Sequence, residues 1–313
     1  MPLIDVLVCS YNESKSIPDL LESLKKQTTS LDEFNIIFVD NASDDNTREI
    51  IENFQKELKN LQYIFEPNKG KSFALNTGYR IATSEYVAHI DADCKADKKW
   101  IENIINLANE EHPSLFGGGY LPYYNSPKPK WFKDKYNTDW REDKRIVLSE
   151  GYLNGCNMIW RRDLVLSLGG HNIELGINEH SLAGGEDTEL IVRARQQCPN
   201  IKIVYDPSIY VYHLTKEKQF NLWYSLRRAF VTGRRHTSIF SDLKNRIIWK
   251  IVPRIILDIL FISENILRGI IFRQRKFYPY FENHLYEVVI PRFGNLGHCY
   301  ELVILCIQRL LLK

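Results

Sequence analysis

The stretch LIDVLVCSYNESKSIPDLLESLKKQ, residues 3–27, joins an apolar run to an amphipathic one and sets the pattern for the first half of the chain. Residues 3–10 are predicted to form a strand. Residues 16–27 are predicted to form a helix, with Ser16 placed to cap it and Pro18 suited to its first turn. The fold therefore begins with a strand that passes directly into a helix.

The same order returns along the first 111 residues. Strands are expected at 34–40, 61–67 and 85–91, and helices at 44–60, 70–83 and 97–111. Such alternation implies right-handed crossovers and an α/β fold, with a mostly parallel sheet flanked by helices. In sheets of this kind, ligands bind beyond the carboxyl ends of the strands.

The regular alternation of strands and helices ends at about residue 113. Residues 114–140 are rich in Gly, Pro and aromatic side chains, which predicts a strand and a long irregular loop. A strand and a short helix are expected within 151–170, a helix within 184–197 and two short strands within 201–213. Beyond residue 217 the chain is expected to be helical, amphipathic and basic.

Charge is distributed unevenly along the chain. The formal net charge is +2, but residues 218–313 hold 16 Lys and Arg against 6 Asp and Glu, while the other residues hold 25 against 33. A neutral-to-acidic body with a basic C-terminal region suggests two tasks. The six cysteines include no CxxC pair, which favours reduced thiols in a cytosolic protein, and no secretory leader or membrane-spanning run is expected.

Two carboxylates follow the strand expected at 85–91. If the strand continues, Asp91 and Asp93 face the same way and project from the carboxyl edge of the sheet. Two hard oxygen ligands favour Mg²⁺ or Mn²⁺, which would neutralise a diphosphate leaving group. The alternative is a solvated loop with an Asx turn or a helix cap.

Three other stretches fall at the same predicted edge. SYNE follows the first strand, where Tyr11 would stack on a base; Asp40 ends the second strand; and Lys69 and Lys71 follow the third. Each stretch alone also fits an ordinary turn or helix cap. Four such coincidences at four strand ends favour a ligand site.

The series VCSYNE, FVDNASDDNT, NKGKSFALNTG and HIDADC resembles the nucleotide-binding half of family-two glycosyltransferases of the GT-A fold. The segments GCNMIWRRDLVLSLGGHNIELG and GGEDTELIVRARQ resemble that family's acceptor-side segment and its ED motif. The resemblance covers roughly residues 3–215, in the expected order. It implies an inverting transfer of a sugar from a nucleotide-sugar, with a UDP-sugar favoured.

The resemblance also implies roles for the donor-side residues. Tyr11 and Asp40 would hold the base, and Asp91 would contact the ribose or the metal. The full set expected to bind the nucleotide-sugar comprises Ser10, Tyr11, Glu13, Asp40, Lys71, Asp91 and Ala92.

For the reaction itself, Asp93 and Asp91 would bind the metal that bridges the diphosphate, with His213 as a third ligand. Asp187 would be the general base that takes the proton of the attacking hydroxyl, and Glu186 would shape the site or contact the acceptor. A general base typically contributes about 10²–10⁴-fold in rate. The alternative for both acidic residues is stabilisation by a helix dipole, which would also lower the pKa of Asp187.

The expected domains are a GT-A catalytic part at 1–217 (a nucleotide-sugar half at 1–112 and an acceptor half at 113–217) and a basic amphipathic region at 218–313. Two of its segments, 246–275 and 298–313, would contact an anionic membrane surface, which would place the protein at the inner face of the cytoplasmic membrane. The alternative is that these segments pack on the catalytic part or on another subunit. No nucleic-acid recognition motif accompanies the basic charge.

The chain lacks the Q-x-x-R-W motif and the membrane spans of processive polymer synthases of this family. Addition of one sugar to a saccharide or polyprenyl-linked acceptor is therefore expected. A sugar nucleotidyltransferase is one rival, but it would carry a Gly-rich, Arg-containing loop where this chain has SYNESKS. A non-catalytic scaffold that keeps the nucleotide site is the other rival.

Overall fold

The computed structural model describes residues 2–176, 184–240, 248–272 and 277–311. The chain forms two compact units. The first comprises Met1–Tyr123, Asp134–Glu179 and Glu186–Thr215, and the second comprises Tyr124–Lys133, His180–Gly185 and Lys216–Lys313. The functions that the sequence assigns to these parts stay predictions.

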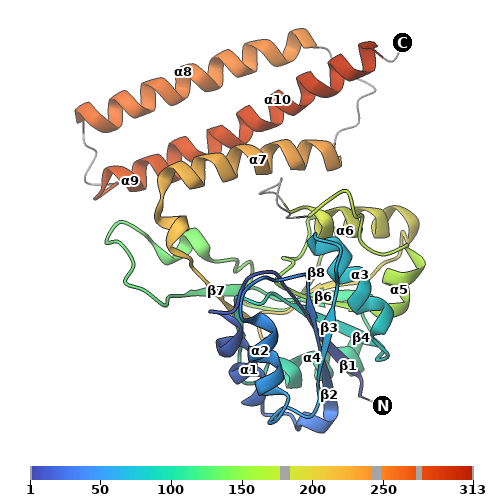
Figure 1. The fold of residues 1–313 in the computed structure, drawn as a ribbon. Helices are drawn as coiled ribbons and strands as arrows, with labels where there is room; N and C mark the ends of the chain where they lie inside the picture. Colours follow the sequence, from blue (N-terminus) through green and yellow to red (C-terminus); the bar gives the residue numbers. More distant parts are fainter. Residues whose placement is uncertain (1, 177–183, 241–247, 273–276, 312–313) are drawn as a thin grey trace. The chain divides into compact units, whose positions relative to one another are not determined.

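An eight-stranded sheet forms the centre of the first unit (Figure 1). Its strands, in spatial order, are β3 (Leu61–Phe65), β2 (Phe34–Asp40), β1 (Ile4–Ser10), β4 (Tyr86–Ile90), β9 (Asn157–Arg161), β6 (Leu115–Gly117), β10 (Ile203–Tyr205) and β8 (Ile146–Val147). The first four run parallel, β9 is antiparallel to both its neighbours, and β10 is parallel to β6. The expected mostly parallel α/β sheet is confirmed.

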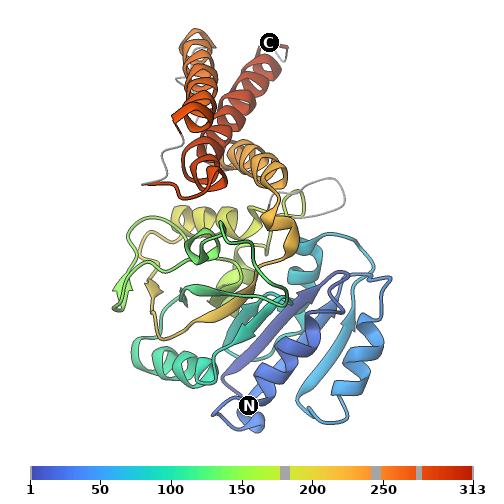
Figure 2. The same cartoon turned by 90° about the vertical axis from the view of Figure 1, so that its left-hand side faces the viewer.

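Helices cover both faces of this sheet. They are α1 (Ile17–Lys25), α2 (Thr47–Phe54), α3 (Lys71–Ile81), α4 (Trp100–Glu111), α5 (Arg162–Ser167) and α6 (Glu186–Gln197), with 3-10 turns at Leu31–Glu33 and Asp134–Asn137. One buried apolar cluster includes side chains of α1, α2 and α4, and a second includes those of α3, α5 and α6. Figure 2 looks onto the side that α1 and α2 cover.

Two local expectations were wrong. Ser16 stands at the N-terminus of α1 but makes no capping bond, because the turn already begins at Glu13 and the Ser16 hydroxyl instead donates to Glu13 Oε2 at 3.3 Å. Helix α2 ends at Phe54 rather than near residue 60. The backbone there tightens into turns, since Lys56 N donates to Asn53 O at 3.2 Å and Glu57 N to Phe54 O at 3.0 Å. Asn60 Nδ2 then donates to Phe34 O at 2.9 Å at the entry into β3.

A second, three-stranded sheet determines where the site lies. Its order is β5 (Cys94–Ala96), β11 (Val211–Leu214) and β7 (Tyr120–Tyr123). Strand β11 runs antiparallel to β5, and His213 pairs with Cys94. The segment that follows β4 is thereby joined to a strand more than a hundred residues later in the chain.

The second unit is helical. It contains a 3-10 turn at Glu217–Phe220, α7 (Leu222–Phe240), α8 (Ile248–Phe272), α9 (Phe281–His284), a π-helical turn at Leu285–Val289 and α10 (Ile290–Leu311). Helix α10 packs against both α7 and α8 (Figure 1). A side chain at Gly233 of α7 would place its Cβ 1.9 Å from Gly294 O, so glycine permits the close approach of α7 and α10. Among the described helices, none combines the length and the apolar character needed to cross a membrane.

Candidate active site

Three predicted metal ligands come together in the first unit. Ligand atoms of Asp91, Asp93 and His213 all lie within 4.8 Å of one another, and His213 Nε2 is 3.7 Å from Asp93 Oδ1. The two aspartates lie in a turn rather than on the strand, because β4 ends at Ile90 and Cys94 N bonds to Asp91 O at 3.0 Å. The expectation of two strand residues facing the same way was therefore wrong, although the carboxylates do converge.

His213 also lies within the same distance of a second ligand pair, the thiols of Cys94 and Cys156. Both cysteines are buried, and burial raises the pKa of each thiol. A protonated thiol is a poor metal ligand. The Asp91, Asp93 and His213 set, with two hard oxygen ligands, is the better match to Mg²⁺ or Mn²⁺.

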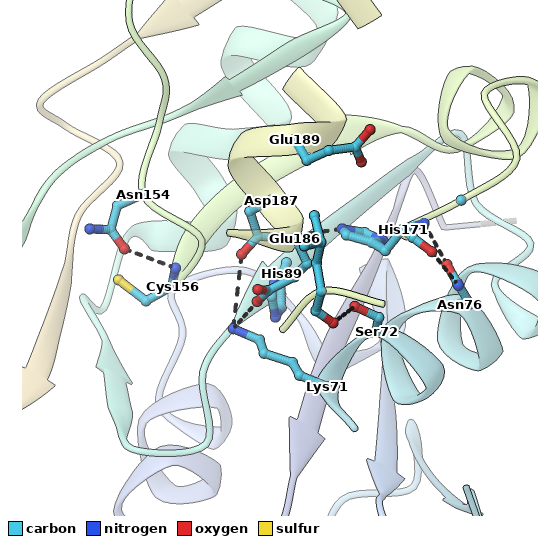
Figure 3. A network of polar contacts seen from close by, with 12 residues as sticks. Lys71, Ser72, Asn76, His89, Asn154, Cys156, His171, Glu186, Asp187 and Glu189 are labelled. Atoms are coloured by element: carbon cyan, nitrogen blue, oxygen red, sulfur yellow. Dashed lines mark hydrogen bonds and ion pairs between the residues drawn. The ribbon is translucent and has the colours of Figure 1, made fainter. Parts of the chain in front are cut away.

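Lys71, the first residue of α3, lies among carboxylates (Figure 3). Its Nζ is 2.9 Å from Asp91 Oδ1, 3.6 Å from Glu186 Oε1 and 3.9 Å from Asp187 Oδ2. Burial opposes the charge on Lys71, but the surrounding carboxylates outweigh it and raise the pKa of the amine well above its usual value. Lys71 is therefore a fixed positive charge between the predicted metal ligands and the predicted base.

Glu186 and Asp187 open α6 and are both buried. Burial alone would raise the pKa of Asp187, but the Lys71 ammonium and a hydrogen bond from His171 outweigh it and hold that pKa well below its usual range. Burial raises the pKa of Glu186, and the adjacent Asp187 carboxylate adds to this because the charges repel. The pair thus contains one firmly ionised carboxylate and one that resists ionisation.

His171 holds the second oxygen of Asp187. Its Nε2 is 3.2 Å from Asp187 Oδ1, and the imidazole must be the donor because a carboxylate only accepts. The backbone at His171 is fixed in turn, since its N–H donates to Asn76 Oδ1 at 2.7 Å and its carbonyl accepts from Asn76 Nδ2 at 2.8 Å. Among the described residues, Nδ1 of this buried ring has no hydrogen-bond partner.

A glycine leaves room for the Asp187 carboxylate. A Cβ built at Gly155 would lie 1.9 Å from Asp187 Oδ2, so any side chain there would collide with the carboxylate. Oδ2, which faces Lys71, is therefore limited on one side by the Gly155 backbone and on the other by the amine.

The donor-side residues follow β1 and β2. Ser10 pairs with Asp40 at the adjacent strand ends, and Ser10 Oγ is buried without a hydrogen-bond partner among the described residues. Asp40 accepts from Ser43 N at 3.0 Å and from Tyr63 Oη at 2.9 Å, which leaves lone pairs on both oxygens for a ligand. Tyr11 is 39% exposed and its hydroxyl accepts from Lys69 Nζ at 3.2 Å.

Glu13 and Ala92 complete the predicted donor set. Glu13 lies in the β1–α1 loop and accepts from Ser16. Ala92 is buried in the turn between Asp91 and Asp93, the two predicted metal ligands. The structure brings Asp91, Asp93, His213, Lys71, Glu186 and Asp187 into one cluster. It places Ser10 and Asp40 side by side at neighbouring strand ends.

Sequence reasoning missed His171 and His89. His171 lies in the segment GCNMIWRRDLVLSLGGHNIELG, but a single histidine between Gly170 and Asn172 carries no signal of its own. His89 lies in the apolar strand β4, where a lone histidine is ordinarily a core residue; its Nε2 is 3.7 Å from Asp91 Oδ1, and burial lowers its pKa to about 4. Only the folded arrangement shows that both imidazoles border the carboxylate cluster.

An α/β sheet with two aspartates beyond β4 and an acidic pair opening α6 is typical of GT-A-fold glycosyltransferases. The chain belongs to glycosyl transferase family 2, whose family model matches residues 5–166, just over half of the sequence. The match includes the strand ends that carry the donor-side residues, whereas Asp187 and His213 lie beyond it.

Relatives support this assignment. Glycosyltransferase AglE of Haloferax volcanii is 25% identical over 188 residues, which cover 59% of each chain, and succinoglycan biosynthesis protein ExoM of Rhizobium meliloti is 24% identical over 76% of this chain and 75% of its own. The first of these matches thus spans less than two thirds of the relative.

Two solved structures share the fold. S. aureus TarS 1-349 in complex with UDP-GlcNAc gives a TM-score of 0.54 at 19% identity, covering 96% of this chain and 91% of that one. Mannosyltransferase PcManGT of Pyrobaculum calidifontis, in complex with GDP-Man and Mn²⁺, gives 0.56 at 20% identity over 76% and 63%. At these identities the likeness shows the fold.

Proposed function

We propose that this protein transfers one sugar, with inversion, from a nucleotide-sugar to a hydroxyl of a saccharide or lipid-linked acceptor during polysaccharide or glycolipid assembly. The observation that carries the proposal is the position of Lys71, whose amine lies within 4 Å of Asp91 on one side and of Glu186 and Asp187 on the other. The carboxylates that we assign to the donor and to the acceptor would therefore meet at one point, as sugar transfer requires.

The donor would bind at the ends of β1, β2 and β4. Ser10 Oγ and the free lone pairs of Asp40 offer hydrogen bonds to base and ribose, and Tyr11 offers a ring for stacking. A UDP-sugar stays the favoured donor. Its diphosphate would approach Asp91, Ala92 and Asp93. The negative charges of the diphosphate and of the two carboxylates would need a cation between them.

A divalent cation fits the residues present, since two carboxylates and an imidazole converge there. Asp91, Asp93 and His213 would hold Mg²⁺ or Mn²⁺, which when bound neutralises charge on a diphosphate leaving group. The solved complex of PcManGT with GDP-Man and Mn²⁺ supports this proposal by analogy of fold. Lys71 supplies a further positive charge beside Asp91, whether or not it touches the phosphates.

Asp187 would take the proton of the acceptor hydroxyl as its oxygen attacks the anomeric carbon. Its depressed pKa keeps it ionised at neutral pH, at the cost of lower basicity. His171 fixes Oδ1, so Oδ2, beside Gly155 and Lys71, is the oxygen left to receive the proton. Glu186, the buried neighbour of Asp187, would shape the acceptor side.

The names of two relatives support the acceptor class. ExoM is a succinoglycan biosynthesis protein, and another relative, 22% identical over 74% of this chain, is the glucosyl-dolichyl phosphate glucuronosyltransferase of Haloferax volcanii. The relatives therefore include a protein of polysaccharide biosynthesis and a glycosyltransferase named for a dolichyl-phosphate-linked sugar. A place at the inner face of the cytoplasmic membrane stays a prediction that depends on the C-terminal helices.

Titration calorimetry with UDP, GDP and dTDP, with and without Mn²⁺, tests the donor site. We expect Mn²⁺-dependent binding of one nucleotide, lost in Asp93→Ala and kept in the matched control Asp163→Ala, which removes an exposed carboxylate on α5. Absence of binding to all three nucleotides would remove the donor site and favour the scaffold alternative.

A further inference from the structure

Helix α8 is apolar on two opposite faces. Its inner face packs within the helical unit, where Ile251 lies in a buried cluster with Cys299 and Leu302 of α10. Further along the same face, Asp258 accepts from Arg292 Nη1 at 3.1 Å, and a Cβ at Gly269 would collide with Phe281 of α9. This face is fully used by the unit's own packing.

The opposite face would be polar if the helix were an ordinary surface helix. Instead it carries an outer stripe of seven apolar side chains that are 41–66% exposed: Val252, Ile256, Ile259, Leu260, Leu267, Ile270 and Ile271. An eighth exposed apolar side chain of this helix, Leu257, borders the stripe. Their spacing of three and four, with Ser263 in the remaining turn, places them along one side of the helix. A continuous exposed stripe of this length marks an interaction surface.

The sequence that contains the outer stripe is basic. Residues 244–276 contain eight Lys and Arg against two acidic residues, Asp258 and Glu264. Asp258 is bound to Arg292, and Glu264 is paired with Arg268 at 2.5 Å. The sequence around the stripe therefore holds an excess of cations that these two carboxylates do not balance.

We propose that the outer stripe of α8 docks on an anionic phospholipid bilayer, with the helix lying in the interface. Apolar side chains would enter the acyl boundary while flanking cations meet lipid phosphates. A second copy of the chain is a poorer occupant, because a symmetric contact would bring two basic segments together. Helix α8 is not apolar enough to cross a membrane, because it contains the charged residues Arg254, Asp258, Glu264 and Arg268.

The sequence offers two candidate segments for membrane contact, 246–275 and 298–313, and the structure distinguishes between them. In α10 the apolar residues Cys299 and Leu302 are buried within the helical unit, and Val303 and Cys306 pack against them. The proposal is therefore confined to α8; residues 246–247, 273–275 and 312–313 of the two segments lie outside the described residues. It goes beyond the proposed sugar transfer, since docking requires neither donor nor acceptor.

Vesicle flotation of the full chain tests the proposal. We expect the wild type to float with vesicles of phosphatidylglycerol and phosphatidylcholine at low salt, and less with phosphatidylcholine alone or at high salt. The double variant Ile256→Glu/Leu260→Glu should lose at least tenfold in vesicle affinity. The control Val147→Glu, which makes the same change at an exposed residue of β8, should bind as the wild type does.

A second variant, Ile270→Glu/Ile271→Glu, keeps the test valid if the first is unstable. Mn²⁺-dependent nucleotide binding, measured in every variant, separates failure of docking from failure of the donor site. The proposal is overturned if the wild type does not float, or if a variant that still binds nucleotide floats equally well. It is also overturned if light scattering shows a wild-type dimer that the variants dissolve while vesicle binding is absent.

Discussion

His171 Nε2 lies 3.2 Å from Asp187 Oδ1, and both side chains are buried. The imidazole is itself anchored through its backbone to Asn76 in α3. His171 therefore orients the proposed base and helps to keep it ionised. It acts through Asp187 and is a positioning residue.

Replacing His171 by Phe should lower kcat by roughly 10–100-fold, part of the general-base contribution, while the donor Kd stays unchanged. Because the hydrogen bond lowers the pKa of Asp187, its loss should move the acid limb of the pH–rate profile to higher pH. His171→Gln, which keeps a donor near Nε2, should restore much of the rate. A rate loss without any shift of the acid limb, or without rescue by Gln, would show that His171 serves packing alone.

Gly155→Ala should disable transfer without weakening donor binding. Its Cβ would lie 1.9 Å from Asp187 Oδ2, and the carboxylate would have to rotate away from its place between the glycine and Lys71. We expect kcat to fall by about 10²-fold or more, as for loss of the base. Gly169→Ala is a control, since nothing lies within 4 Å of a Cβ at that position. Because Gly169 has a positive φ, alanine there should lower the stability of the protein without touching the site. Equal rates in wild type and Gly155→Ala would contradict the assigned role of Oδ2.

Ser10→Ala tests the donor subsite. The Ser10 hydroxyl is buried and has no hydrogen-bond partner among the described residues, so its removal breaks no bond within the described protein. If this hydroxyl binds the nucleotide, the Kd should rise by roughly two- to tenfold, the effect of about 0.5–1.5 kcal/mol per hydrogen bond, with no loss of thermal stability. An unchanged Kd would place the nucleotide away from the end of β1.

The substitution Asp206→Asn tests whether the charge of the Asp206 carboxylate, which follows β10, stabilises the fold. Its carboxylate accepts from Ser208 N at 2.9 Å and from Arg145 Nε at 2.7 Å. Burial opposes the charge on Asp206, but hydrogen bonds from Ser208 and Arg145 outweigh it and lower the pKa. The substitution should reduce the free energy of unfolding at pH 7 by about 1.5–3 kcal/mol.

The pH dependence of that loss has a definite sign. A lowered folded-state pKa gives stability that is present above the usual aspartate value of about 3.9 and is lost as the pH falls through the folded value. The difference between wild type and Asp206→Asn in urea unfolding should therefore stay nearly constant from pH 7 to about pH 5 and shrink as the pH falls below about 4. A constant difference would mean that the charge of Asp206 contributes nothing.

Much of the fold was predictable because its information is local. The strand at Ile4–Ser10 and the helix at Ile17–Lys25 are defined by short-range apolar patterns, and parallel order follows from their alternation. The meeting of Asp93 with His213 was predictable only through the family resemblance, since it depends on pairing between β5 and β11.

Other features required the folded chain. His171 becomes informative only when the packing of α6 and α3 places it against Asp187. Apolar periodicity predicted an amphipathic helix around Ile256, but not that its apolar residues occupy two opposite faces. Which of those faces packs internally is decided by α10, a partner far along the sequence.

The most direct measurement compares wild type and Asp187→Asn for release of nucleoside diphosphate from the donor that binds, with polyprenyl-diphosphate-linked saccharides as acceptors. The matched control is Glu189→Gln, on the same helix but paired with Arg193. We predict a loss of about 10²–10⁴-fold in rate for Asp187→Asn, with the donor Kd kept and the control active. Equal rates in wild type and Asp187→Asn, or no release by a wild type that binds its donor, would contradict the account.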